Sequence, residues 1–118
     1  MNEVSGSPVV DYQMITIIEG EGDTVQSGDV VDWNYKCSFL DGRLHEDSRE
    51  RKGKWKFVVG KGMVIECLDR AIQHMRKGTT AIVRCPPELA YGYDMWHGGI
   101  PDGSTLIYEI ELIDFSHP

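Results

Sequence analysis

Helical periodicity is confined to one short segment of this 118-residue chain, residues 65–75. Apolar side chains recur there at spacings of three and four, and charged or polar side chains fall on the opposite face. Arg76 and Lys77 follow, and Gly78 then ends the segment, as is typical of a helix C-terminus. A single short amphipathic helix needs a sheet to cover its apolar face. We therefore expect an α+β fold with the helix packed on one face of a sheet.

Alternation of apolar and polar residues predicts the strands. From Val31 to Cys37 every second residue is apolar, so one face of this strand is expected to be buried and the other solvated. Asp41-Gly42 follows and predicts a tight hairpin turn. Further strands are expected at residues 9–18, 55–59, 80–85 and 104–115.

The composition fits one domain that folds without help from metals or disulfides. Hydrophobic residues make up 41% and charged residues 26% of the chain, as in ordinary globular proteins. Residues 1–8 have little to bury, so we expect a flexible tail there, followed by one domain at residues 9–116. The charged run at residues 46–54 is interpreted as a solvated loop.

The three cysteines, Cys37, Cys67 and Cys85, lie in apolar segments and are odd in number. We interpret them as reduced thiols in the core rather than as a disulfide framework. The cysteines lack CxxC spacing, and the histidines are not paired at helical spacing. The sequence therefore predicts no metal site and no cofactor.

Charge and hydropathy argue against two classes of partner. The formal net charge of −7 would repel a phosphate backbone, so nucleic acid is not expected as a partner. No apolar run approaches the roughly 18 residues of a membrane span, and residues 1–8 lack the features of a signal peptide. We expect a monomer in the cytosol or nucleus, with no membrane contact.

A long connection at residues 86–103 is the first place to look for a site, because loops beyond about 12–15 residues are usually functional. Its Tyr93-Asp94-Met95-Trp96-His97 segment is unusually aromatic. Exposed Tyr, Trp and Met side chains are favoured at protein interfaces, so this segment is a candidate surface for a partner protein. The sequence leaves open the alternative that Trp96 folds over the rim of a pocket.

Short motifs between residues 28 and 112 carry a more specific signal. The strongest are Val64-Ile65, Ala90-Tyr91-Gly92 and Ile100-Pro101. The supporting pieces are Gly28-Asp29-Val30-Val31, Tyr35, Asp41-Gly42, Asp47-Ser48, Lys56-Phe57, Met75, Gly78 and Glu111-Leu112. In order and spacing they resemble the FK506-binding protein (FKBP) family, over about residues 9–115.

The resemblance implies a curved antiparallel sheet of about five strands wrapped around the helix, with a shallow pocket between them. It also implies rotation of Xaa-Pro peptide bonds, and binding of proline-containing peptides and of the macrolides FK506 and rapamycin. Carried over by position, the pocket residues would be Tyr35, His45, Glu46, Trp55, Val64, Ile65, Leu68, Tyr91, Ile100 and Tyr108. Tyr91, Glu46 and Tyr35 would serve catalysis, with Tyr91 donating a hydrogen bond to the carbonyl beside the proline. Ile65 would offer its backbone N–H to a ligand carbonyl.

An apolar pocket suits this reaction because no covalent bond is broken. Rotation about a peptide bond costs about 18–20 kcal/mol, since twisting removes the amide resonance. The twisted amide is less dipolar than the planar one, so apolar walls favour the transition state over the ground state. Aromatic and aliphatic walls are therefore sufficient, and neither a nucleophile nor an acid–base pair is required.

Two departures from the family pattern bear on activity. Leu68 stands where active members usually carry Trp, and leucine offers no aromatic face to a proline ring. Members with leucine at this position tend to be weak or silent isomerases. His45-Glu46 replaces the usual Phe-Asp, which makes one wall more polar. Both changes are expected to weaken macrolide binding.

The sequence thus predicts an FKBP-type peptidyl-prolyl cis-trans isomerase that assists protein folding with reduced activity. The alternative is a non-catalytic binding or co-chaperone module that recruits a partner protein. Larger members of the family join such domains to helical TPR repeats that bind chaperones. The sequence leaves open whether this chain is part of such a protein.

Overall fold

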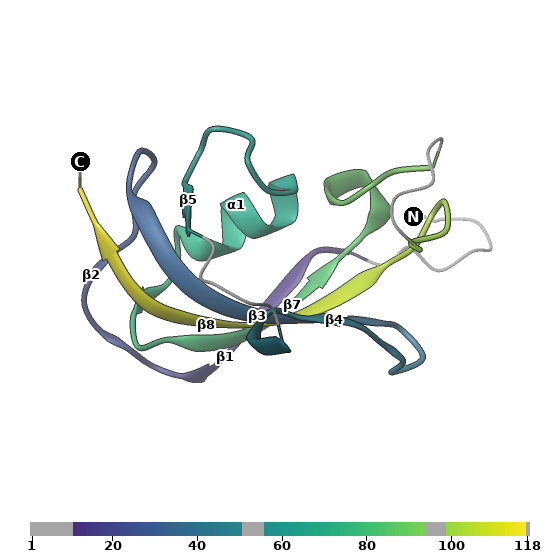
Figure 1. Cartoon of the computed structure of the whole chain (residues 1–118), viewed down its shortest axis with the longest axis horizontal. Helices are drawn as coiled ribbons and strands as arrows, with labels where there is room; N and C mark the ends of the chain where they lie inside the picture. The colour runs from purple at the N-terminus through teal and green to yellow at the C-terminus, as the bar shows by residue number, and fades with distance from the viewer. Residues whose placement is uncertain (1–10, 51–55, 94–98, 118) are drawn as a thin grey trace, which may run out of the picture.

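The computed structural model describes residues 11–50, 56–93 and 99–117. Within these ranges, one short helix lies over the concave side of a curved sheet (Figure 1). The tail expected at residues 1–8, the predicted pocket residue Trp55 and most of the aromatic segment at residues 93–97 lie outside the described residues.

The main sheet is antiparallel and has six strands in the described part of the chain. Its order is β1 (Gln13–Ile18), β7 (Thr80–Cys85), β8 (Leu106–Ser116), β3 (Val30–Phe39) and β4 (Leu44–Asp47), with β5 (Lys56–Val58) also paired to β3. A two-stranded sheet joins β2 (Glu21–Thr24) to β6 (Arg76–Lys77). Two short 3-10 helices, η1 (Ser48–Glu50) and η2 (Pro87–Leu89), follow β4 and β7. The α+β class expected from the sequence is confirmed.

The two long central strands, β3 and β8, follow the predicted alternation. In β3, Val31, Trp33, Tyr35 and Cys37 are buried, while the residues between them are more exposed. β8 is paired with β3 along its length and with β7 on its other side, so Cys37 lies opposite Tyr108. These two strands therefore form the centre of the sheet and fix where their side chains meet the helix.

The helix α1 (Glu66–Ile72) is shorter than the 65–75 segment that periodicity predicted. Beyond Ile72 the chain continues in tight turns, in which the N–H of His74 donates to the carbonyl of Ala71 at 3.0 Å. Met75 is nevertheless fully buried, so the apolar period runs past the end of the helix. Gly78 turns the chain as expected, with a φ of 91° that favours glycine.

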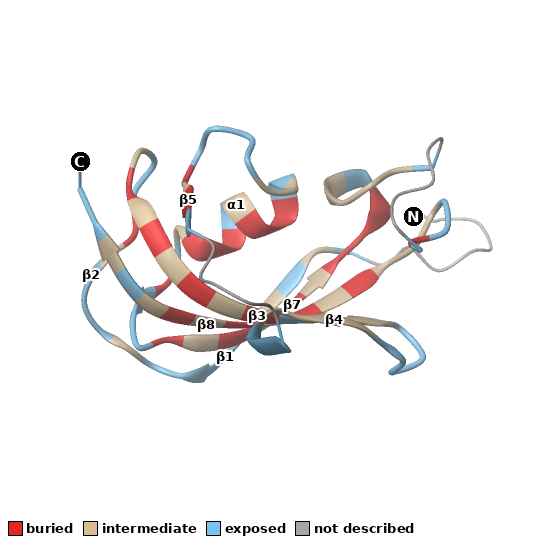
Figure 2. Cartoon of the chain, viewed as in Figure 1, coloured by how far each residue is buried: buried red, intermediate tan, exposed pale blue. Residues whose placement is uncertain are grey.

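The core lies between α1 and the concave face of the sheet, where Figure 2 shows the buried residues gathered. α1 contributes Cys67, Leu68, Ala71 and Ile72 from its buried face. These pack into one cluster with the inward residues of β3, β7 and β8. The amphipathic stripe seen in the sequence is thus the face by which the helix is held on the sheet.

A disulfide joins Cys67 and Cys85, so the prediction of three reduced thiols is wrong for this pair. Cys67 lies on the buried face of α1 and Cys85 on the buried face of β7, and their Cα atoms are 5.7 Å apart. That separation is typical of a disulfide. The pairing depends on how the helix lies across the strand, which residue spacing does not reveal. Cys37 is a free, buried thiol, as predicted.

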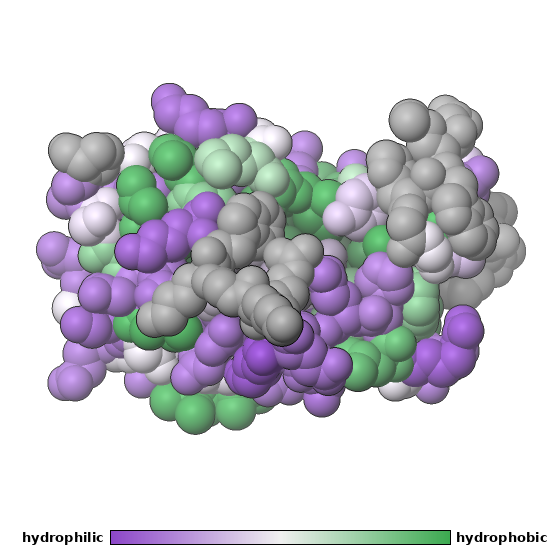
Figure 3. All heavy atoms as spheres, viewed as in Figure 1, coloured by the Kyte–Doolittle hydropathy of each residue, from purple (hydrophilic) through white to green (hydrophobic). Residues whose placement is uncertain are grey.

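β1 forms one edge of the main sheet in the described residues and carries an irregularity. The pairing of β1 with β7 shifts register between Thr16 and Ile18. Ile15, Ile17 and Ile18 of this strand are about half exposed, with relative accessibilities of 50%, 56% and 55%. The face seen in Figure 3 carries many hydrophilic residues, with apolar residues in small groups between them. None of the helices described is long and apolar enough to span a membrane.

Candidate ligand pocket

A cavity of about 560 Å³ opens between the start of α1 and the concave face of the sheet. Strands β3, β4 and β8 supply one side, and the segment leading into α1 supplies the other. Its lining comprises Trp33, Tyr35, Glu46, Gly62, Met63, Val64, Ile65, Leu68, Tyr91 and Tyr108. The fold therefore brings together residues that are far apart in the sequence.

Most of the predicted pocket positions meet in this cavity. They are Tyr35, Glu46, Val64, Ile65, Leu68, Tyr91 and Tyr108. The other positions do not line it in the described structure. His45 packs edge-on against the ring of Phe39, with centroids 5.5 Å apart, and Ile100 is buried in the core at 5% exposure. Trp55 lies outside the described residues.

Three lining residues were not identified from the sequence: Trp33, Gly62 and Met63. Trp33 lies two residues before Tyr35 on the same face of β3, so strand alternation placed it near the pocket. Gly62 has a φ of 71°, and its turn brings Met63 and Val64 to the rim. The position of Trp33 could have been inferred from strand alternation in the sequence. The positions of Gly62 and Met63 depend on the conformation of the turn.

Tyr35 and Glu46 form a fixed polar pair on one wall. The hydroxyl of Tyr35 donates to Glu46 Oε1 at 2.7 Å. The backbone N–H of Tyr35 donates to the hydroxyl oxygen of Ser48 at 2.8 Å, which ties β3 to the residue that follows β4. The carboxylate therefore enters the cavity already hydrogen-bonded, so its orientation is set before any ligand binds.

Tyr91 is positioned by the turn that follows η2. The N–H groups of Ala90 and Gly92 both donate to the carbonyl of Pro87, at 3.0 and 2.9 Å. Gly92 has a φ of 75°, a conformation that side chains disfavour, and its carbonyl accepts from Gly103 at 2.8 Å. These bonds hold the backbone on both sides of Tyr91 while its ring faces the cavity.

Three buried or partly buried polar groups at or near the cavity are neutral: Tyr91, Tyr108 and Cys37. Burial raises the pKa of Tyr108 far above its usual value and raises the pKa of Cys37 to about 11. Burial also raises the pKa of Tyr91, and a hydrogen bond from Tyr108 partly opposes this. Of these three groups, Tyr91 and Tyr108 line the cavity. Because both keep their protons at neutral pH, their hydroxyls are uncharged and can donate hydrogen bonds.

The arrangement can hold an uncharged ligand between aromatic and aliphatic walls and donate to a carbonyl oxygen. It offers no nucleophile activated by a neighbouring base among the lining residues. In the described part of the chain, no cluster of three or more His, Cys, Asp or Glu residues could hold a metal ion. The aromatic and aliphatic walls with a donor hydroxyl suit binding of a ligand and a change in its conformation.

Comparison with known proteins places the pocket in a family. The family model for FKBP-type peptidyl-prolyl cis-trans isomerases matches residues 21–113. Peptidyl-prolyl cis-trans isomerase FKBP4 of Rattus norvegicus is 38% identical over 112 residues, covering 92% of this chain and 24% of the relative. Peptidyl-prolyl cis-trans isomerase Fkbp12 of Drosophila melanogaster is 35% identical over 102 residues, covering 86% of this chain and 94% of the relative.

A further relative shows the same partial overlap as the first. Peptidyl-prolyl cis-trans isomerase FKBP9 of Mus musculus is 38% identical over 91 residues, or 77% of this chain and 16% of the relative. The chain thus spans about a quarter or less of the length of FKBP4 and FKBP9, but matches nearly the whole of the small Drosophila protein.

Proposed function

Because the chain belongs to the FKBP-type peptidyl-prolyl cis-trans isomerase family, we propose that it accelerates rotation of Xaa-Pro peptide bonds in the cavity between α1 and the sheet. The observation that carries the proposal is the meeting of Tyr91, Ile65 and Leu68, from separate segments, in one cavity with aromatic and aliphatic walls. Proline-containing peptides and unfolded proteins are the proposed substrates, and assistance to protein folding is the proposed role.

The geometry supports a mechanism in three parts. The proline ring enters between the aromatic walls, where removal from water favours the less dipolar, twisted amide. The hydroxyl of Tyr91 donates to the carbonyl beside the proline, and the backbone N–H of Ile65 serves a second carbonyl. Tyr35 and Glu46, joined by a hydrogen bond of 2.7 Å, give one wall a fixed polar group beside the ligand. No proton needs to be transferred.

The same cavity is proposed to accept macrolides of the FK506 and rapamycin type. The polar pair Tyr35 and Glu46 lies in its wall, and Leu68 occupies its floor, so weak macrolide binding and reduced isomerase activity are part of the proposal. A monomeric state and a cytosolic or nuclear location stay predictions. The Cys67–Cys85 disulfide weighs against that location, because thiols there are usually kept reduced.

The test is isomerisation of a short Xaa-Pro peptide, followed by exchange NMR with unmodified protein, Tyr91→Phe and Tyr93→Phe. Tyr93 is a matched control, since it is 56% exposed and its hydroxyl donates to Glu88 at 2.8 Å, outside the cavity. We expect acceleration by the unmodified protein and by Tyr93→Phe, and a clear loss in Tyr91→Phe. Equal acceleration by all three proteins would place the reaction outside this pocket.

The second candidate is a non-catalytic module that recruits a partner protein through residues 93–97. The exposed ring of Tyr93, the one described residue of that segment, favours it. No acceleration by a correctly folded unmodified protein would support this candidate over the first. A peptide that binds in the cavity without being isomerised would show that the module has kept its ligand site.

A further inference from the structure

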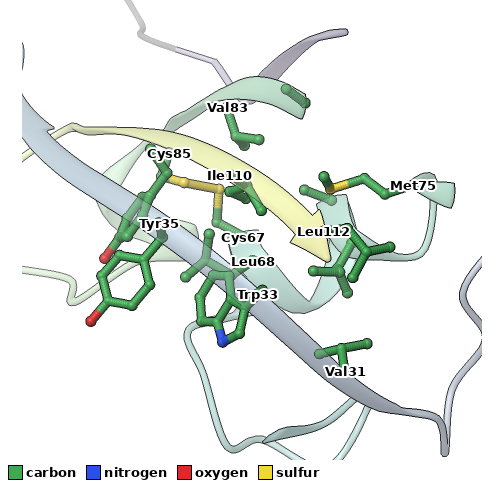
Figure 4. Packing of buried hydrophobic residues seen from close by; sticks show 14 of the residues in the cluster. Val31, Trp33, Tyr35, Cys67, Leu68, Met75, Val83, Cys85, Ile110 and Leu112 are labelled. Carbon is green, nitrogen blue, oxygen red and sulfur yellow. A yellow bond between two sulfur atoms is a disulfide. The ribbon is translucent and has the colours of Figure 1, made fainter. Parts of the chain in front are cut away.

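One of the residues that line the cavity is a tryptophan of the sheet, Trp33. Trp33 lies on the inward face of β3 and shares the cavity wall with Leu68 of α1. Figure 4 shows its ring beside the Leu68 side chain and next to Tyr35. Trp33 and Leu68 have the same small exposure, 4% each, and both line the cavity. What remains exposed of the indole therefore faces the ligand space.

The indole is held in one orientation by two other rings. It stacks on Tyr35 with ring centroids 4.7 Å apart and an interplanar angle of 30°. Phe57 of β5 meets it edge-on at 5.0 Å and 67°. Such offset-stacked and edge contacts are the geometries that aromatic rings prefer. A ring fixed from two sides loses little conformational entropy when a ligand packs on it.

Leu68 and Trp33 are complementary in size at this point. A leucine on α1 leaves room above β3 for an indole, and protein interiors are packed too closely to hold a second large ring there without rearrangement. We propose that Trp33 supplies the aromatic platform for the proline ring that other family members obtain from a tryptophan at the position of Leu68. This inference rests on the proposed function, and it leaves the polar pair Tyr35 and Glu46, rather than a missing aromatic platform, as the reason for the reduced activity proposed there.

If Trp33 is the platform, peptide affinity should depend on having one indole at this place, from either β3 or α1. Four proteins are compared: unmodified, Trp33→Val, Leu68→Trp and the double variant. Binding of a short Leu-Pro peptide is measured by NMR titration, and isomerisation by exchange NMR. We expect Trp33→Val to weaken binding by about tenfold, equivalent to about 1.4 kcal/mol. Leu68→Trp alone should bring no gain, because the second indole is crowded. The double variant should recover most of the affinity, because the single indole then comes from the helix.

A core control separates the platform from general destabilisation. Val31 lies on the same face of β3 and is fully buried, but it does not line the cavity. Val31→Ala should lower the urea midpoint and leave peptide affinity of the folded protein unchanged. Affinity retained in Trp33→Val, or a double variant no better than Trp33→Val, would overturn the proposal. A sharp gain in Leu68→Trp alone would do the same, since it would mean that the floor lacks an aromatic platform.

A measurement on the unmodified protein keeps the proposal testable even if Trp33→Val fails to fold. The indole N–H resonance of Trp33 should shift on peptide addition, and contacts between its ring protons and the proline ring should appear in NOE spectra. Saturation of binding without either effect would overturn the platform. If the peptide contacts Trp33 and is not isomerised, the platform stands for binding and only the proposed catalysis fails.

Discussion

Reduction of the Cys67–Cys85 disulfide is predicted to lower the free energy of unfolding by about 3 kcal/mol. The two cysteines are 18 residues apart in the sequence, so the bond closes a medium-sized loop in the unfolded chain. The loop-closure relation gives an entropy of about 11 cal/mol/K for such a loop, or about 3 kcal/mol at 25 °C. Both sulfur-bearing residues are fully buried, so reduction also leaves two thiols in the core to be accommodated.

The assay is urea unfolding monitored by circular dichroism, on protein kept oxidised and on protein reduced in urea and refolded with reductant. The midpoint should fall in the reduced sample, and the m-value should rise, because the unfolded chain without the cross-link exposes more surface. Cys37→Ala retains the disulfide and serves as the matched control. It should lose some stability by truncation but respond to reductant as the unmodified protein does.

Thiol counting makes the result decisive. Alkylation in denaturant without reductant should modify one cysteine, Cys37, and alkylation after reduction should modify all three. Modification of all three without reductant would refute the disulfide itself. Unfolding free energies that agree within about 0.5 kcal/mol between oxidised and reduced protein would refute the loop-closure argument, since the expected difference is several times larger.

Two further predictions concern the buried hydroxyl and thiol groups. Burial raises the pKa of Cys37 from 9.0 to about 11, so the unfolded chain releases this proton first and the free energy of unfolding should fall between those pH values. The fall should be on the order of 2 kcal/mol and absent from Cys37→Ala in parallel urea titrations. Tyr108→Phe removes the hydroxyl whose hydrogen bond lowers the pKa of Tyr91, so that pKa should rise further. Carbon-13 NMR titration of labelled tyrosine checks this, and an unchanged Tyr91 curve would mean that the two hydroxyls are not bonded.

Strand alternation predicted the sheet well because its two faces differ so strongly. β3 and β8 have one face on the core and one toward solvent, so their residues had to alternate. The helix boundary was less predictable. Met75 lies in a turn after α1 and is fully buried. The apolar spacing therefore continues past the helix because this side chain is buried, and not because the backbone there is helical. The short strands β2, β4 and β6 were missed, since two to four residues carry too little periodicity. β4 and η1 include residues 46–50, so the interpretation of 46–54 as a loop was wrong for that part.

The motifs predicted much of the cavity lining, and strand geometry explains two of the differences. Successive residues of a strand point to opposite sides, and in β4 the cavity side is taken by Glu46. His45 therefore packs against Phe39 instead. Alternation placed Trp33 on the buried face of its strand, and where a sheet curves over a helix one ring can serve both core and cavity. Which buried residues border the cavity depends on that curvature, which the sequence pattern does not specify.

The register shift in β1 has a consequence for assembly. A straight, uncharged edge strand with half-exposed isoleucines would be a template for another strand, and regular pairing of that kind leads to aggregation. The irregularity between Thr16 and Ile18 interrupts the even spacing of hydrogen-bonding groups that an incoming strand would need. Among the described residues, β1 is thus an edge whose pairing is interrupted by geometry, while Gln13–Ile18 carries no charge. The same half-exposed isoleucines on a regular edge would be a better template for strand addition than they are here.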